Sequence, residues 1–216
     1  MAAIDELVKV ENAQEKYSFS QQDHIFKSQL DQRGISEQDT QAKFQFIHLN
    51  GAHVPFIYDE NMNIIDEEEG TYEQTMLAVL SGAGNYVEKL RGSGAYDNTV
   101  LIIMADHGYN GSLDESGEEA WMRQCPLLLI KGMGETHDTM QISQAPISFE
   151  DLQEAYTRLL DGKQSTAAFD WKEGDARERR FLRYSFLDDD HMQEYIQTGY
   201  ASDMDTMIPT GREYNR

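Results

Sequence analysis

The chain has 216 residues, a length that suits one ordinary or one large domain. Its 39 acidic and 18 basic residues give a formal net charge of −21, which argues against nucleic acid as a partner because phosphates would be repelled. There is no run of 18 apolar residues, so we find no membrane span, and Met1–Asn12 lacks the apolar core of a secretory signal. The single cysteine, Cys125, excludes an internal disulfide and is expected to be a buried structural thiol.

Residues 1–42 are polar and are predicted to form a helical lead-in. Apolar residues at helical spacing in Ile4–Val8 and Ile25–Leu30 predict one or two surface helices, and Arg33-Gly34 is a stop signal. We expect no buried strand in this segment.

Residues 43–187 are predicted to form an α/β domain, and residues 188–216 an irregular C-terminal tail. Between the predicted elements, the acidic loop Asp59–Gly70 is expected on the surface. The predicted elements are the strands Phe44–Leu49, Val100–Ala105 and Pro126–Ile130, the helix Tyr72–Leu90, a helix from a capping box at Ser148 to Leu160, and a late edge strand at Arg180–Phe186.

Strand, helix and strand in succession form a crossover unit, which normally joins parallel neighbours. We therefore expect Phe44–Leu49 and Val100–Ala105 to lie parallel in one sheet. The loop that carries His53 and the turn that carries Asp106 and His107 would then open at the same sheet edge, where ligands bind in α/β folds.

Asp106 and His107 offer a hard oxygen and a borderline nitrogen, which together suit a divalent metal. The alternative is a strand-end aspartate that caps a turn, with His107 merely beside it, and the local sequence leaves both interpretations open. His48 is expected to be a packed core residue, and His137 a solvated loop histidine.

Five segments occur in the order seen in the alkaline phosphatase superfamily. Asn50–Phe56 resembles its G-x-H-x-P-[YF] loop, and Tyr96–Thr99 followed by Asp106–Gly108 resembles its "dNT…sDHG" block. Cys125–Ile130 resembles the next strand, and Ile147–Leu152 the segment that enters a late helix. The branch that the chain resembles contains sulfatases, lipoteichoic acid synthases and phosphoethanolamine transferases.

This resemblance implies an alkaline-phosphatase-like α/β sandwich with a mainly parallel central sheet and one or two divalent cations (Zn, Mn, Ca or Mg). It implies that Asp106 and His107 are metal ligands. It also implies that His53 contacts a phosphate or sulfate oxygen of the substrate or protonates the leaving group. For a parent enzyme of the lipoteichoic acid synthase type, it implies envelope glycans or lipids as substrates, at the extracytoplasmic face of the membrane.

The family's nucleophile and a further acidic ligand follow an earlier strand, and residues 1–42 contain no such strand. We therefore expect the chain to correspond to a C-terminal portion, with weak metal binding and little or no turnover by itself. Self-association, or a complementing N-terminal half, is the expected partner. The alternative function is a non-catalytic, degenerate sulfatase-fold module that binds a partner or an anionic ligand.

Overall fold

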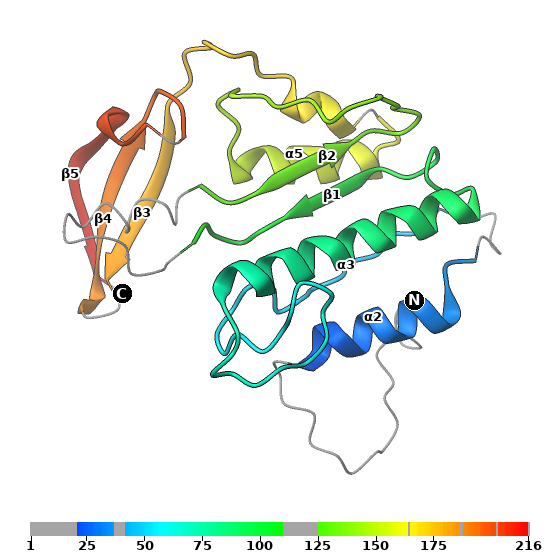
Figure 1. Ribbon diagram of the computed structural model, residues 1–216. Coiled ribbons are helices and arrows are strands. Elements are labelled where there is room, and N and C mark those ends of the chain that lie inside the picture. Colours follow the sequence, from blue (N-terminus) through cyan, green and yellow to red (C-terminus); the bar gives the residue numbers. More distant parts are fainter. Residues whose placement is uncertain are drawn as a thin grey trace. The chain divides into compact units, whose positions relative to one another are not determined.

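The computed structural model describes residues 21–36, 42–109, 125–163, 165–185, 188–201 and 203–215. They form two compact units, divided between Asp97 and Asn98, and each unit is described by itself (Figure 1). The division falls within the segment 43–187. Helices and small sheets are both present, so the chain is of the α/β class.

The first unit contains two helices that lie side by side, α2 (Gln22–Arg33) and α3 (Tyr72–Ser93) (Figure 1). Both confirm the predicted helices, whereas the one expected around Ile4–Val8 lies outside the described residues. A capping box at Thr71 begins α3, because its side chain accepts a hydrogen bond from the backbone of Gln74 and the Gln74 side chain accepts one in return.

A small apolar cluster of Tyr58, Met62 and Ala78 forms the core of this unit. Met62 belongs to the acidic segment expected on the surface, yet it is 1 % exposed and has a left-handed backbone (φ 63°). The tight turn that it forms is closed by an antiparallel bridge between Tyr58 and Ile64. The acidic loop therefore contributes one buried side chain to the core.

The strand predicted at Phe44–Leu49 is not formed, which corrects the sequence-based expectation. Residues 42–50 have no regular secondary structure, and Phe44 and Phe46 are 60 % and 71 % exposed. Strand propensity measures how well side chains pack on a sheet, so an apolar alternation does not form a strand without a partner. His48, expected in the core, is also exposed.

In the second unit, β1 (Leu101–Met104) and β2 (Leu128–Lys131) confirm two predicted strands. They pair antiparallel, with Leu101 opposite Lys131 and Met104 opposite Leu128. All strand pairs in the described residues are antiparallel, so a mainly parallel central sheet is not seen there.

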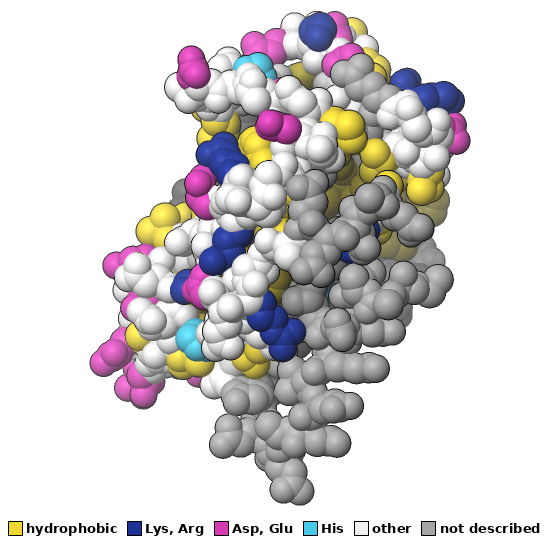
Figure 2. Space-filling view, turned by 90° about the vertical axis from the view of Figure 1, so that its right-hand side faces the viewer, with side chains coloured by type: hydrophobic (Ala, Val, Ile, Leu, Met, Phe, Trp, Pro, Cys, Tyr) yellow, Lys and Arg dark blue, Asp and Glu magenta, His cyan; other side chains and the backbone are white. Residues whose placement is uncertain are grey.

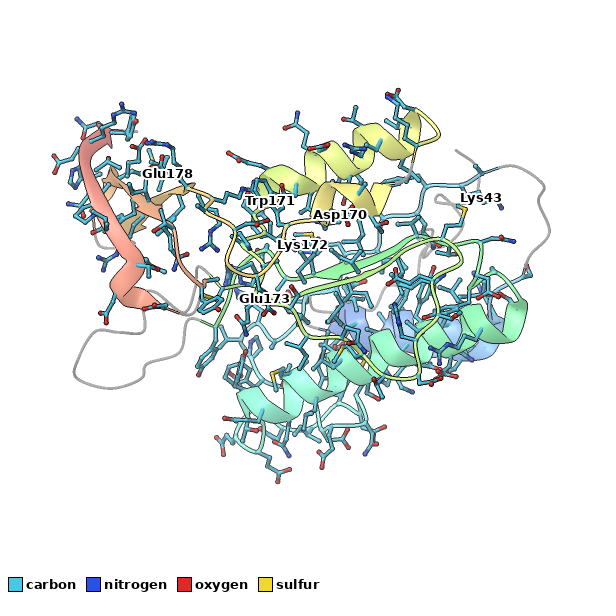
Figure 3. All side chains as sticks on the ribbon, turned by 90° about the horizontal axis from the view of Figure 1, so that it is seen from above. Lys43, Asp170, Trp171, Lys172, Glu173 and Glu178 are labelled. Atoms are coloured by element: carbon cyan, nitrogen blue, oxygen red, sulfur yellow. The ribbon has the colours of Figure 1, made fainter. Side chains whose placement is uncertain are left out.

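Helix α5 (Phe149–Leu160) has the predicted bounds and begins at the predicted capping box, formed by Ser148 and Asp151. A 3-10 turn, η2 (Ser165–Phe169), follows it. The carboxylate of Asp151 is buried and lies 2.6 Å from the guanidinium of Arg177. The indole of Trp171, which is labelled in Figure 3, donates to the same carboxylate at 3.3 Å. Arg177 therefore serves as a structural ion-pair partner of α5.

The last part of the chain forms a three-stranded antiparallel sheet of β3 (Arg179–Ser185), β4 (Asp188–Gln197) and β5 (Met207–Asn215), with a short turn η3 (Met204–Thr206) between β4 and β5. Strand β3 confirms the predicted late edge strand. The prediction of an irregular tail over residues 188–216 is wrong, because most of this segment pairs in the sheet.

Cross-strand pairs account for the order in that segment. The rings of Phe181 and Tyr195 stack with centroids 5.8 Å apart, and the buried carboxylate of Glu194 binds Arg180 at 3.1 Å and accepts from the Tyr214 hydroxyl at 3.1 Å. The acidic residues at the start of β4 suggested a loop in the sequence, whereas the partners of Glu194 on the neighbouring strands show that this sheet accommodates a charged side chain.

On the face shown in Figure 2, acidic side chains occur at several separate places and hydrophobic side chains also reach the surface. In the parts of the chain that the structure describes, no helix is both long enough and apolar enough to span a bilayer.

Candidate functional site

The loop that carries His53 is held at its start by a buried carboxylate. Asp23, in the first turn of α2, is 1 % exposed. Its Oδ1 accepts a hydrogen bond from the Asn50 backbone N–H at 2.7 Å, and its Oδ2 accepts one from the Gly51 N–H at 3.0 Å. One carboxylate thus fixes two successive peptide groups that lie far from it in sequence.

Burial raises the pKa of Asp23 above its ordinary value. The two backbone donors and the nearby His48 act in the opposite direction and offset part of the effect. The Asp23 carboxylate therefore gives up hydration and is held by these two backbone hydrogen bonds.

The far end of the same loop is closed by packing against Gly70. A Cβ atom on Gly70 would lie 1.7 Å from the carbonyl oxygen of Phe56, so only glycine allows this approach. Just beyond, the Ile65 N–H donates to the Ile57 carbonyl at 2.9 Å. The segment from Asn50 to Phe56 is therefore fixed at both of its ends.

His53 is exposed, and its Nδ1 lies 2.6 Å from the backbone carbonyl of Val54. A carbonyl oxygen only accepts, so Nδ1 carries the proton and the neutral ring presents the lone pair of Nε2 to its surroundings. Donation from Nε2 to a substrate oxygen then requires the protonated imidazolium.

The turn that carries Asp106 and His107 follows β1 in the second unit. The Ala105 N–H donates to the Leu127 carbonyl at 3.0 Å and extends the β1–β2 pairing up to this turn. Asp106 is 92 % exposed, and its Oδ1 accepts from the His107 backbone N–H at 3.0 Å. This contact is the one that the turn-capping interpretation predicts.

The imidazole of His107 is oriented in the same way as that of His53. Its Nδ1 lies 2.6 Å from the Gly108 carbonyl, so Nδ1 carries the proton and Nε2 retains its lone pair. Nε2 lies 4.0 Å from Oδ1 of Asp106. A carboxylate oxygen and an imidazole nitrogen, each with a lone pair that could bind a cation, therefore lie 4.0 Å apart on the surface.

A second histidine–carboxylate pair in the same unit provides a contrast. Nε2 of His137 lies 2.9 Å from Glu135, whose other oxygen accepts from the Gly132 N–H at 2.6 Å. These bonds hold the pKa of Glu135 below its ordinary value, first through Gly132 and then through His137. His137 is exposed, as predicted for a loop histidine, and the pair uses its donor atoms internally.

The structure brings Asp106 and His107 together and places His53 in the first unit. Within the described ranges, no group of three or more His, Cys, Asp or Glu side chains is arranged to hold a metal.

Sequence reasoning missed Asp23 and Gly70. An acidic residue in a first helical turn is commonplace, so Asp23 carried no signal of a contact with Asn50.

Comparison with known proteins gives no further assignment: the chain matches no protein-family model, no curated protein and no solved structure.

Proposed function

We propose that this chain carries the metal-binding and substrate-contacting part of a metal-dependent phospho- or sulfo-ester hydrolase or transferase of the alkaline phosphatase type. The observation that carries the proposal is the donor pair formed by Asp106 and His107 at the end of β1. The ordered set of motifs that resembles this superfamily supports it. Within the α/β class, we propose the more specific architecture that this superfamily has, an alkaline-phosphatase-like sandwich with a mainly parallel central sheet.

The donor pair fits a divalent cation. With bonds of about 2.1 Å to each donor, a tetrahedral ion separates its ligand atoms by roughly 3.4 Å. Nε2 of His107 and Oδ1 of Asp106 are 4.0 Å apart, so a rotation of the exposed Asp106 side chain is enough to close the difference. The ion would polarise an ester oxygen and lower the pKa of an attacking group.

In this proposal His53 binds an oxygen of the phosphate or sulfate group. Because Nδ1 is bonded to Val54, the atom that faces the substrate is Nε2. Nε2 donates to the substrate only if the ring carries a proton on both nitrogens, and the positive charge of that form would also complement an anionic substrate. The resulting hydrogen bond is charge-assisted, which makes it roughly twice as strong as a neutral one.

The matching motifs supply no nucleophile. Two ligands from this chain bind a divalent ion weakly, since zinc sites generally use three or four protein ligands. We therefore propose that the polypeptide by itself gives no ester turnover, and that a complementing segment or a second chain provides the rest of the site. Envelope glycans or lipids are the substrate class that the resemblance suggests.

Paramagnetic relaxation by Mn²⁺ tests the metal site directly. We expect Mn²⁺ to broaden the NMR signals of His107 and its neighbours at low added concentration, and Asp106→Ala to abolish the broadening. The Glu135–His137 pair is an internal control, because its donor atoms already bind each other. Equal broadening at His137 and His107, or broadening that persists in Asp106→Ala, would contradict the proposed site.

The same protein separates the two candidate functions. A degenerate binding module is favoured if His107 shows no response to Mn²⁺ or Zn²⁺. Turnover of aryl phosphate or aryl sulfate by the isolated chain that disappears in Asp106→Ala would overturn the expectation of inertness while supporting the enzyme assignment.

A further inference from the structure

We propose that Asp23 is a positioning residue that holds the loop of His53 in the conformation that presents Nε2. The inference rests on the proposed function for the role of His53 as a substrate contact. The contacts from which it is argued all lie within the first unit. None of the motifs that resemble the alkaline phosphatase superfamily includes Asp23.

The first step concerns the two hydrogen bonds to Asp23. Oδ1 and Oδ2 are each used once, by the neighbouring N–H groups of Asn50 and Gly51. Two bonds to one rigid carboxylate fix both the position and the orientation of the peptide group between Asn50 and Gly51. Since Asp23 is itself 1 % exposed and anchored in α2, it cannot follow the loop if the loop moves.

The second step follows the chain from this anchor to His53. Gly51 has φ +70°, a conformation that glycine adopts readily and that directs the chain out of the anchor. Ala52 is then the one residue between Gly51 and His53. On the other side of His53, the ring of Pro55 fixes its own φ and restricts Val54. Little backbone freedom therefore remains at His53.

The third step connects this restriction with the ring of His53. Its Nδ1 bonds to the carbonyl of Val54, the next residue, and that contact depends on the local backbone angles. A solvent-exposed neutral imidazole normally favours the Nε2–H form. At His107 an adjacent carbonyl gives the same form without such an anchor. At His53 we infer that Asp23 keeps the Val54 carbonyl in place, and so maintains the Nδ1–H form with Nε2 directed outward.

The test begins with wild-type protein. We expect scalar couplings across the hydrogen bonds, from the amide nitrogens of Asn50 and Gly51 to the Asp23 carboxylate carbon, and a predominantly Nδ1–H tautomer at His53 in the ring nitrogen shifts. If these couplings are absent and the two amides exchange as fast as unprotected ones, Asp23 does not hold the loop and the inference is wrong. This measurement also decides the matter if variants at Asp23 fail to fold.

The variant is Asp23→Asn, with Asp31→Asn as its matched control. Asp31 lies on the same helix but is exposed and pairs with Lys27 and Asn85. In Asp23→Asn we expect amide exchange at Asn50 and Gly51 to accelerate roughly tenfold or more, and the ring of His53 to shift toward the Nε2–H form. In Asp31→Asn neither should change. An unchanged His53 tautomer in folded Asp23→Asn would overturn the inference.

A titration with inorganic phosphate keeps this inference apart from the proposed function. If phosphate leaves the His53 signals of the wild type unchanged, the proposed substrate contact fails, whereas the tautomer measurement still decides the role of Asp23. If phosphate perturbs His53 equally in the wild type and in Asp23→Asn, the proposed contact holds and the positioning role is wrong.

Discussion

The two candidate regions differ in what holds them. The His53 loop is fixed by residues that are distant in sequence, namely the buried Asp23 on α2 and Gly70 against Phe56. Beyond the Ala105–Leu127 hydrogen bond that leads into it, the Asp106–His107 turn is held among the described residues by contacts between adjacent residues, and Asp106 is 92 % exposed.

The difference teaches that the same residue types can serve opposite purposes. Asp23 loses hydration and gains backbone partners, so it contributes to structure. Asp106 keeps its oxygens largely exposed to solvent, so it gains most when a cation or another ligand arrives. Substitutions at the two regions should therefore separate effects on stability from effects on binding.

The largest effect is expected for Gly70→Ala. The added Cβ would lie 1.7 Å from the Phe56 carbonyl oxygen, so the backbone must move. We expect the free energy of unfolding to fall by about 3 kcal/mol, measured by urea denaturation. The matched control is Gly84→Ala in α3, where an added Cβ would meet nothing within 4 Å. This substitution should raise the free energy of unfolding by about 0.5–1 kcal/mol. Equal effects of the two substitutions would show that the loop is not closed at Gly70.

A smaller effect is expected for Asp23→Ala, compared with Asp106→Ala. Removal of the Asp23 carboxylate leaves the N–H groups of Asn50 and Gly51 without their partner, so we expect a loss of about 2 kcal/mol. Asp106→Ala, without added metal, should change the unfolding free energy by less than about 0.5 kcal/mol. A larger loss at Asp106 than at Asp23 would reverse the assignment of structural and binding roles.

The smallest effect is expected in the pH dependence of the free energy of unfolding, to which two aspartates of α2, Asp23 and Asp31, contribute in opposite ways. Burial raises the folded-state pKa of Asp23 above 3.8, so the folded protein holds that proton more tightly than the unfolded chain. The contribution of Asp23 to stability therefore increases as pH falls through the raised pKa toward 3.8, and is constant below. Lys27, followed by Asn85, lowers the pKa of Asp31, so its contribution is present above 3.8 and is lost as pH falls through the lowered pKa.

Chemical denaturation across acid pH tests this pair. The advantage of the wild type over Asp23→Asn should grow as the pH falls toward 3.8, while its advantage over Asp31→Asn should shrink below 3.8. Because Asp31 is exposed, screening keeps its effect small. Parallel pH curves for the two variants would contradict the buried environment of Asp23.

Local signals were sufficient for several elements. The capping box at Ser148 and the apolar spacing after it determine α5, and Arg33-Gly34 ends α2 where the sequence indicates. The orientation of His107 is also local, since its partner is the adjacent residue Gly108. These features depend on residues within one or two turns of each other, which a sequence pattern can express.

Pairing between distant segments is what the sequence leaves undetermined. It predicted a strand at Phe44–Leu49 that has no partner strand in the described residues, and an irregular tail where β4 and β5 pair. It gave no sign that Asp23 would bind Asn50 and Gly51. The amino-acid order by itself determined the helices α2, α3 and α5 and the adjacent positions of Asp106 and His107, because these depend on short-range spacing. Only the tertiary structure decided which carboxylate is buried and which strands pair, because burial and β hydrogen bonds need partners from elsewhere in the chain.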